Sequence, residues 1–347
     1  MVKMTFRWFG SGDPVGLEKI RQIPGISGVV SAVYGVPVGE AWSEEAIAEL
    51  KAQVESAGLE LEVIESVPVH EEIKLGGKMA PQLIENYCTS LRRLGKAGVK
   101  VVCYNFMPVF DWLRSTLALA LPDGSNALAY DHEQVLAMNP RGGGLSLPGW
   151  DESYKNEELQ ELLCRYEAVG EEELWANLAA FLRGVIPAAE EAGIRMAIHP
   201  DDPPWGIFGL PRVITGKAGI ERLFGIYDSP ANGLTLCTGS LGADGNNDLA
   251  AMAAAWAKRI PFAHLRNISR TGERRFAEAP HPSCCGSLDI YAIARALVEN
   301  GFNGHVRPDH GRMIWGETGR PGYGLYDRAL GACYLNGLFE ALERSEK

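Results

Sequence analysis

Four residues that can bind a divalent metal ion follow apolar segments typical of buried strands. They are His199 in MAIHPDDPP, Cys237 in LTLCTGS, His264 in FAHLRNIS and Asp309 in VRPDHGRM. Two imidazoles, a thiolate and a carboxylate form a complete ligand set for such an ion, and the thiolate by itself favours Zn²⁺ or Fe²⁺. Burying the four groups without a shared partner would leave polar atoms unsatisfied. The residue types therefore predict one shared metal site.

The spacing within these segments places the candidate ligands on one face of their strands. Side chains two residues apart in a strand point to the same side. In a parallel barrel the carboxyl ends of the strands form the active face, so side chains from four strand ends can converge there. The predicted pairs that share a face are Ala197 with His199, Thr235 with Cys237, Phe262 with His264, and Arg307 with Asp309.

Eight apolar segments alternate with segments of helical period along the chain. Helical segments such as 44–58 and 287–301 end in glycine, which is typical of a helix C-terminus. Strict alternation favours a closed (β/α)₈ barrel over an open doubly wound sheet, and the GxGxxG fingerprint is missing after the first strand. We predict one (β/α)₈ TIM-barrel domain over residues 1–347, with strands within 4–10, 26–33, 59–67, 99–106, 194–200, 233–239, 260–268 and 304–311.

The interval after the fourth predicted strand is anomalously long. About sixty residues separate this strand from the helix before the fifth, far more than the usual short loop of a βα unit. Long insertions at the carboxyl ends of barrel strands often serve function. We therefore predict that residues 107–165 form an inserted lid or interface region above the barrel mouth, with a plain surface excursion as the alternative.

Composition excludes several classes of protein. The chain is 46% hydrophobic and 22% charged, and no apolar run approaches the roughly 20 residues that span a bilayer. A net charge of -11 argues against nucleic acid and anionic membranes as partners. The seven cysteines show no CxxC spacing, so we expect reduced thiols. The first residues lack the pattern of a signal peptide, and a cytoplasmic location is predicted.

Several motifs together resemble the D-mannonate dehydratase family. They are FRWFG near the start, CYNFMPVFDW from Cys103, HLRN from His264 and RPDHGRMIWGETGRPGYGLYDRALG from Arg307. The resemblance covers essentially the whole chain. It implies a fold similar to xylose isomerase, Mn²⁺ or another divalent ion such as Fe²⁺, Co²⁺ or Mg²⁺, and a homodimer. It also implies conversion of the small sugar acid D-mannonate to 2-keto-3-deoxy-D-gluconate, in hexuronate (glucuronate) catabolism.

The resemblance also assigns roles to residues. The family's metal ligands fall on the four residues already selected, and its catalytic pair falls on His310 and Tyr323, with Tyr326 as a rival for the tyrosine. Five polar residues at or near strand ends are candidates to orient an anionic polyol, because guanidinium and amide groups donate to carboxylates and hydroxyls. These candidate substrate-binding residues are Arg7, Asn105, Arg266, Asn267 and Arg312.

Two other functions remain open from the sequence. A sugar isomerase or epimerase on the same barrel is disfavoured, because related sites typically place glutamate ligands where this chain has His199 and Cys237. A non-catalytic sugar-acid binding protein would need no acid–base pair beside the metal. Detection of a keto-acid product would distinguish a dehydratase from an isomerase or epimerase and from a binding protein.

Overall fold

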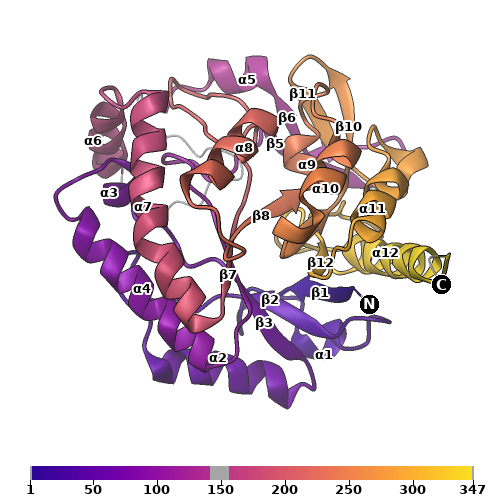
Figure 1. Cartoon of the computed structure of the whole chain (residues 1–347). Coiled ribbons are helices and arrows are strands. Elements are labelled where there is room, and N and C mark those ends of the chain that lie inside the picture. Colours follow the sequence, from indigo (N-terminus) through magenta and orange to yellow (C-terminus); the bar gives the residue numbers. More distant parts are fainter. Residues whose placement is uncertain (1, 141–155, 346–347) are drawn as a thin grey trace.

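The computed structural model describes residues 2–140 and 156–345, and its centre is a closed barrel of parallel strands (Figure 1). Within these ranges eight strands form the barrel in the order β1-β12-β9-β8-β7-β4-β3-β2. Each one overlaps a segment predicted from the sequence, so the predicted barrel is confirmed. The strands are β1 (Lys3–Arg7), β2 (Gly28–Ser31), β3 (Glu60–Glu65), β4 (Val101–Tyr104), β7 (Arg195–Ile198), β8 (Asn232–Cys237), β9 (Phe262–Leu265) and β12 (His305–Pro308).

Successive side chains of the barrel strands point alternately into the barrel and out toward the helices, and so form an inner and an outer layer. The inner layer is a distinct buried cluster made of Val30, Val63, Val101, Cys103, Ala197 and Phe262. Their neighbours in sequence, such as Val29, Ile64 and Val102, belong to the large core between the strands and the helices. Because side chains alternate, His199 and His264 are on the same side of their strands as Ala197 and Phe262. The inner layer therefore forms a packed floor beneath the predicted site.

Helices surround the barrel, with α2, α4 and α7 on one flank and α10, α11 and α12 on another (Figure 1). Gly58 and Gly301 follow α2 and α11 with φ of 75° and 79°, the left-handed conformation that glycine adopts without strain. The helices are α1 (Leu17–Ile20), α2 (Glu44–Ser56), α3 (Glu71–Lys74), α4 (Ala80–Lys96), α5 (His132–Ala137), α6 (Asn156–Tyr166), α7 (Glu171–Ala192), α8 (Lys217–Ile226), α9 (Thr238–Leu241), α10 (Leu249–Trp256), α11 (Ile290–Glu299) and α12 (Tyr326–Ser345), with short 3₁₀ turns η1 (Ala257–Arg259) and η2 (Ser283–Cys285).

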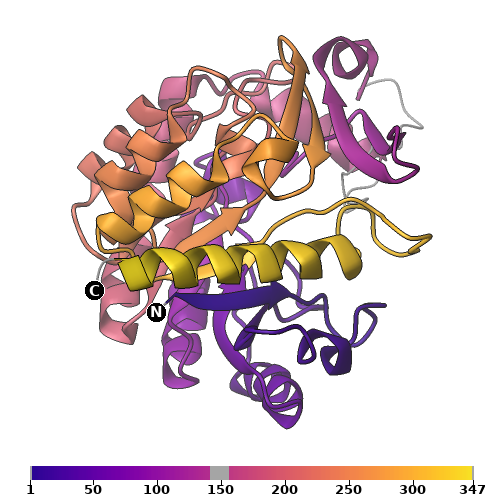
Figure 2. The same ribbon diagram turned by 90° about the vertical axis from the view of Figure 1, so that its right-hand side faces the viewer.

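The two ends of the chain meet at the side of the barrel. Figure 2 shows the C-terminal helix α12 running beside β1, near the start of the chain. The backbone N–H of Val2 donates a hydrogen bond of 2.8 Å to Glu343 Oε1. The last helix therefore covers the seam between the first and last strands of the barrel.

A second, antiparallel sheet sits beside the barrel mouth and combines two separate parts of the chain. Its order is β10-β11-β6-β5, with β5 (Thr116–Ala120) and β6 (Asn126–Asp131) from the predicted insertion. The other two strands, β10 (Asn267–Gly272) and β11 (Arg275–Ala279), form a hairpin after β9 (Figure 2). The sequence predicted one continuous strand over 260–268, which is wrong. β9 ends at Leu265, because the backbone N–H and carbonyl oxygen of the next residue, Arg266, bond to Thr238 Oγ1 and not to a neighbouring strand.

The predicted insertion packs against the loops of the barrel mouth. Trp112 forms a parallel bridge with Asp202, and Asn126 pairs with Met313 through two backbone hydrogen bonds of 3.1 and 2.8 Å. Residues 141–155 of the predicted insertion lie outside the described residues. The role of segment 107–165 as a lid or an interface stays a prediction.

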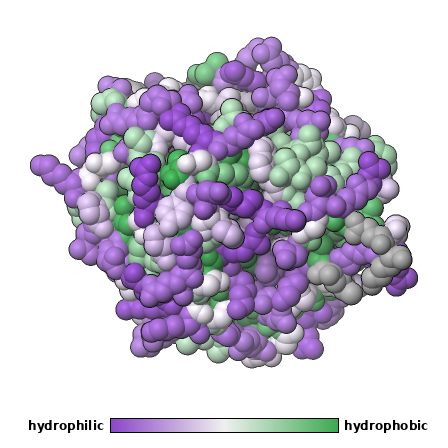
Figure 3. Space-filling model, in the orientation of Figure 1, coloured by the Kyte–Doolittle hydropathy of each residue, from purple (hydrophilic) through white to green (hydrophobic). Residues whose placement is uncertain are grey.

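Hydrophilic side chains cover most of the face seen in Figure 3, with apolar ones scattered between them. Within the described ranges no helix combines the length and the apolar character needed to cross a bilayer.

Close packing of α4 against α7 provides a test of the outer layer. A Cβ atom added to Gly95 would lie 2.4 Å from the carbonyl oxygen of Ala192. Replacing Gly95 with Ala should therefore force the helices apart and lower the free energy of unfolding by roughly 1–3 kcal/mol. The matched control is Gly225→Ala in α8, where a Cβ meets no atom within 4 Å and helix propensity should add up to about 1 kcal/mol. Equal melting temperatures for the two variants would contradict this account.

Candidate active site

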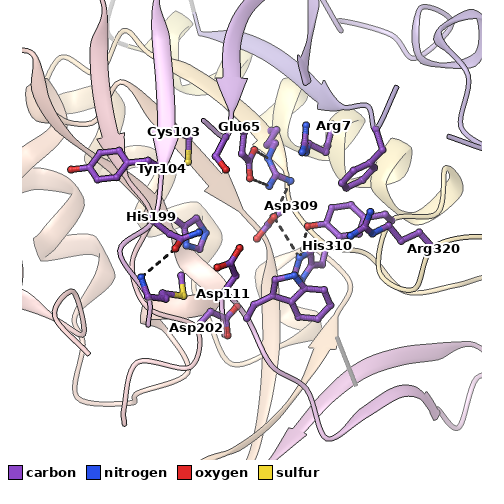
Figure 4. A pocket seen from close by; sticks show the side chains of 17 residues that line it. Arg7, Glu65, Cys103, Tyr104, Asp111, His199, Asp202, Asp309, His310 and Arg320 are labelled. Atoms are coloured by element: carbon purple, nitrogen blue, oxygen red, sulfur yellow. Dashed lines mark hydrogen bonds and ion pairs between the residues drawn. The ribbon is translucent and has the colours of Figure 1, made fainter. Parts of the chain in front are cut away.

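A pocket of about 180 Å³ opens at the carboxyl ends of the barrel strands. Figure 4 shows Glu65, Asp111, His199 and Asp309 pointing toward its centre, with Arg7 and Arg320 at its edge. The pocket combines residues of the barrel with Asp111 and Trp112 from the insertion. Its barrel residues include Arg7, Glu65, Cys103, His199 and Arg307.

Three of the four predicted metal ligands come together at the floor of this pocket. One donor atom from each of His199, Cys237 and His264 lies within 4.8 Å of the other two. Cys237 ends β8, His264 lies in β9, and His199 directly follows β7. Cys237 and His264 are fully buried, whereas His199 reaches the pocket. The strand ends thus converge as the sequence predicted.

The hydrogen bonds around these residues fit a bound divalent cation. His199 Nδ1 lies 2.7 Å from the carbonyl oxygen of Pro200 and donates to it, so Nε2 is the ring nitrogen that could bind a metal ion. Within residues 2–140 and 156–345 the buried His264 Nε2 has no hydrogen-bond partner, although it lies 3.5 Å from Glu65 Oε2. Ser240 Oγ donates to Cys237 Sγ over 3.0 Å. The cluster therefore offers two imidazoles and a sulfur, and the Arg266 Nη2 atom also lies 3.9 Å from that sulfur.

Asp309 lies beside the same cluster but is also paired with arginines. Its oxygens are 3.4 Å from Cys237 Sγ and 3.7 Å from His264 Nδ1. They also form ion pairs of 2.7 Å with Arg266 Nε and 2.8 Å with Arg307 Nη1. Although burial alone would raise the pKa of Asp309, neighbouring positive charges, among them the guanidiniums of Arg307 and Arg266, hold it well below its usual value, so the carboxylate is ionised. Its role as the fourth ligand stays a prediction.

A second group in the described structure shares His264 and could be mistaken for the metal site. Glu65, Cys103 and His264 also bring donor atoms within 4.8 Å of one another. However, Arg307 holds the Glu65 carboxylate with two hydrogen bonds of 3.1 and 2.9 Å. Burial raises the pKa of Cys103 well above its usual value, so this thiol keeps its proton. The first cluster is the better cation site.

The predicted catalytic pair forms a chain of hydrogen bonds with a third residue. His310 Nε2 lies 2.9 Å from Tyr323 Oη, and His310 Nδ1 lies 3.1 Å from Glu278 Oε1. Because the Glu278 carboxylate can only accept, Nδ1 carries a proton, and Nε2 is then free to accept the phenolic proton. Burial lowers the pKa of His310 and raises that of Tyr323. Both groups therefore favour their neutral forms.

The rival tyrosine lies elsewhere. Tyr326 is 43% exposed and packs on Trp315 with ring centroids 5.5 Å apart, whereas Tyr323 lines the pocket. The backbone of Tyr323 is held by Arg328, whose Nη2 donates to the Tyr323 carbonyl oxygen over 2.5 Å. Burial lowers the pKa of Arg328 to about 9. The geometry favours Tyr323 over Tyr326.

A buried ion network lies beside the predicted catalytic pair, His310 and Tyr323. Arg114 pairs with Asp202 through bonds of 2.8 and 3.0 Å and with Glu278 at 3.2 Å. Arg266 pairs with Asp202 at 2.8 Å and also contacts Glu278. Burial alone would raise the pKa of Asp202. The two guanidiniums lower this pKa by more than burial raises it, so the aspartate stays charged. The network joins the insertion, the β10–β11 hairpin and the barrel.

The structure divides the five predicted substrate-binding residues into two groups. Arg7 and Asn105 line the pocket. Arg266 belongs to the ion network, and the Asn267 side chain donates to the carbonyl oxygens of Pro282 and Leu288. Arg312 pairs with Asp327 at 2.9 Å and Asp123 at 2.6 Å. The placement of these three does not support a contact with substrate.

Sequence reasoning missed several residues of the site. Glu65 and Arg307 form an ion pair in the pocket wall, Asp111 and Trp112 come from the insertion, and Glu278 contacts His310. Glu278 is a charged residue within the apolar run FAEAP. A polar residue in an apolar run is the signal that identified His264, and it could have identified Glu278 too.

Asp111 is the acidic residue that the insertion adds to the pocket. Burial raises its pKa above the ordinary value of 3.8.

A closed barrel with this charged pocket at its mouth defines a barrel enzyme that acts on a small polar molecule. The family model for D-mannonate dehydratase matches residues 2–347. The chain is 56% identical to mannonate dehydratase 2 of Halalkalibacterium halodurans, over 98% of this chain and 99% of that protein. The chain belongs to the D-mannonate dehydratase family, which confirms the resemblance found in its motifs.

Solved structures agree with this assignment. The structure of mannonate dehydratase from Streptococcus suis serotype 2 superposes with a TM-score of 0.92 and 52% identity, over 100% of this chain and 96% of that one. A xylose isomerase domain protein from Planctomyces limnophilus matches with a TM-score of 0.55 at 12% identity, over 99% of this chain and 98% of that one. The second likeness concerns the fold alone and confirms the predicted xylose isomerase-like barrel.

Proposed function

We propose that this chain removes water from D-mannonate to give 2-keto-3-deoxy-D-gluconate, in the pocket at the barrel mouth. Family membership over residues 2–347 supports the reaction. The observation that carries the assignment to this pocket is the Glu278–His310–Tyr323 chain, with bonds of 3.1 and 2.9 Å, beside the His199–Cys237–His264 cluster. Dehydration requires acid–base groups next to a site that stabilises negative charge, and these two features supply both.

The reaction takes a weakly acidic hydrogen from C2, beside the carboxylate, and expels the hydroxyl of C3. The proton lost from C2 and a proton delivered to the leaving hydroxyl must both be handled, and the resulting enol then becomes the keto acid. Tyr323 and His310 are proposed to carry these protons. The hydrogen bond to Glu278 keeps the proton on His310 Nδ1, so that Nε2 can accept the hydrogen bond from Tyr323 Oη.

His199, Cys237, His264 and Asp309 are proposed to hold the metal ion, and Mn²⁺ is proposed from the family resemblance, with Fe²⁺, Co²⁺ or Mg²⁺ as alternatives. A divalent ion there would act as a Lewis acid toward the negative charge that develops on the substrate. Trp112 and Tyr323 line the same pocket, and the Trp112 ring lies beside His310 with ring centroids 5.5 Å apart.

Product analysis tests the proposal directly. Purified protein with Mn²⁺ and D-mannonate should produce a 2-keto-3-deoxy acid that reacts with thiobarbiturate or semicarbazide. D-Gluconate and D-altronate serve as substrate controls. Saturable binding without a product would support a sugar-acid binding protein, and a ketose or epimer product would support an isomerase; either result overturns the dehydratase proposal.

The cellular setting is proposed from the same resemblance. We propose a cytoplasmic homodimer that works in hexuronate (glucuronate) breakdown. All seven cysteines are free thiols, which agrees with a reducing compartment. Sedimentation of the purified protein tests the dimer, and a monomer at micromolar concentration would contradict it.

Substitution of Glu278 tests the proposed support of His310. Glu278→Gln should lower kcat by about 10–100-fold with little change in KM, because the amide can also donate and no longer fixes the His310 tautomer. Glu273→Gln, at an exposed position between β10 and β11, is the matched control. Because Glu278 also pairs with Arg114 and Arg266, thermal unfolding must be measured in parallel. A fall in kcat that only follows the folded fraction would contradict this role.

A further inference from the structure

Arg320 lies at the edge of the pocket, on the segment between β12 and α12 (Figure 4). Its guanidinium carbon is 4.3 Å from the centroid of the Phe9 ring and 5.7 Å from that of Tyr323. Phe9 and Tyr323 pack edge to face, with centroids 4.8 Å apart. The rings of Phe9 and of Tyr323, the proposed catalytic tyrosine, therefore hold this guanidinium at the edge of the pocket.

The other guanidiniums that line the pocket already have acceptors within the protein. Arg7 Nη1 lies 3.2 Å from the Val30 carbonyl oxygen and 3.4 Å from that of Trp8. Arg307 donates to Glu65 and also pairs with Asp309. The Arg320 guanidinium, by contrast, makes no hydrogen bond or ion pair with residues 2–140 or 156–345; its contacts there are with aromatic rings.

Stacking on a ring uses the flat face of a guanidinium and leaves its N–H groups free at the edge. Five donors in a planar fork match the two oxygens of a carboxylate. We propose that Arg320 binds the C1 carboxylate of the substrate and sets its direction in the pocket. This inference rests on the proposed function, because it assumes that the substrate is an aldonate.

This orientation fits the chemistry. The hydrogen to be removed is on C2, the carbon next to the carboxylate. A carboxylate held by Arg320 places C2 beside Tyr323, since the guanidinium is 5.7 Å from that ring and Tyr323 Oη is 2.9 Å from His310 Nε2. The other hydroxyls then extend across the pocket toward His199 and Asp111, which line it. Arg320 therefore selects for an acid at C1 and aligns the reacting carbon.

Two substitutions at the exposed Arg320 separate charge from shape. Arg320→Met keeps an apolar chain that can pack on Phe9 but loses all donors. It should raise KM for D-mannonate roughly 10- to 100-fold, with a smaller change in kcat. Arg320→Lys, which keeps the charge but not the fork, should give an intermediate KM. Arg295→Met is the matched control, because Arg295 is an exposed arginine that stacks on Tyr291 in α11, outside the pocket.

Two further measurements decide whether the carboxylate is the group recognised. In Arg320→Ala, whose short side chain leaves room beside Phe9, added methylguanidinium should partly restore KM, and it should leave Arg295→Met unchanged. D-Mannitol, which has a hydroxymethyl group in place of the carboxylate, should inhibit Arg320→Met and wild type equally or inhibit neither. An unchanged KM in Arg320→Met, or mannitol inhibition that weakens as much as mannonate binding, overturns the inference. Absence of wild-type turnover would instead overturn the proposed function.

Discussion

Replacing His310 with Asn is expected to lower kcat by about 10²–10⁴-fold, the usual contribution of a general acid–base group. Asparagine can still meet Glu278 or Tyr323 but cannot take up a proton. Bound metal per chain should stay at the wild-type level, because His310 is not among the proposed ligands. Steady-state kinetics with metal analysis of the same samples measures both quantities.

The control for this prediction is His132→Asn, since the His132 ring contacts Tyr130 and Arg274 away from the pocket. Tyr323→Phe should reproduce the loss seen in His310→Asn, because it removes the hydroxyl at the end of the same chain. Tyr326→Phe should remain near wild type, as its exposed ring packs on Trp315. Normal turnover in His310→Asn would show that His310 takes no part in the mechanism. Loss of activity in Tyr326→Phe but not in Tyr323→Phe would show that Tyr326 is the catalytic tyrosine.

The barrel and the convergence of its strand ends could be predicted because both depend on local pattern. Each strand is a short apolar run, and alternation within it fixes which face a polar residue occupies. His264 shares a face with Phe262, and Phe262 indeed lies in the inner layer. Parallel strands then bring their carboxyl ends to one mouth whatever lies between them. This is why His199, Cys237 and His264 were found without long-range information.

The second sheet could not be predicted in the same way. β6 pairs with β11 across a long stretch of chain, Phe276 opposite Tyr130, and nothing local in either segment specifies the partner. The network that ties Arg114 to Asp202 and Glu278 depends on that pairing. Arg266 was predicted to contact the substrate because it follows a strand end. In the structure its guanidinium instead forms ion pairs with the buried carboxylates of Asp202 and Glu278. Arg320 lies in a glycine-rich loop without periodicity, so its place at the pocket emerges from the fold alone.

Cys237 offers the sharpest test of the proposed metal centre, because another buried thiol, Cys103, belongs to the neighbouring group that shares His264. Cys237→Ser should weaken Mn²⁺ binding by at least about 100-fold and abolish turnover, since a neutral hydroxyl replaces an anionic sulfur ligand. Cys103→Ser should keep its metal. Cys103 accepts a hydrogen bond of 3.3 Å from Thr235 Oγ1 and belongs to the group whose Glu65 is neutralised by Arg307.

Removal of the ion with a chelator should inactivate wild type and Cys103→Ser alike, and added Mn²⁺ should restore both. Direct titration of the apoprotein with Mn²⁺ gives the affinities independently of catalysis. If Cys237→Ser retained its metal and Cys103→Ser lost it, the metal site would instead be the group formed by Glu65, Cys103 and His264. That result would place the ion beside Arg307, where the paired charges of Glu65 and Asp309 would have to be rearranged to admit it.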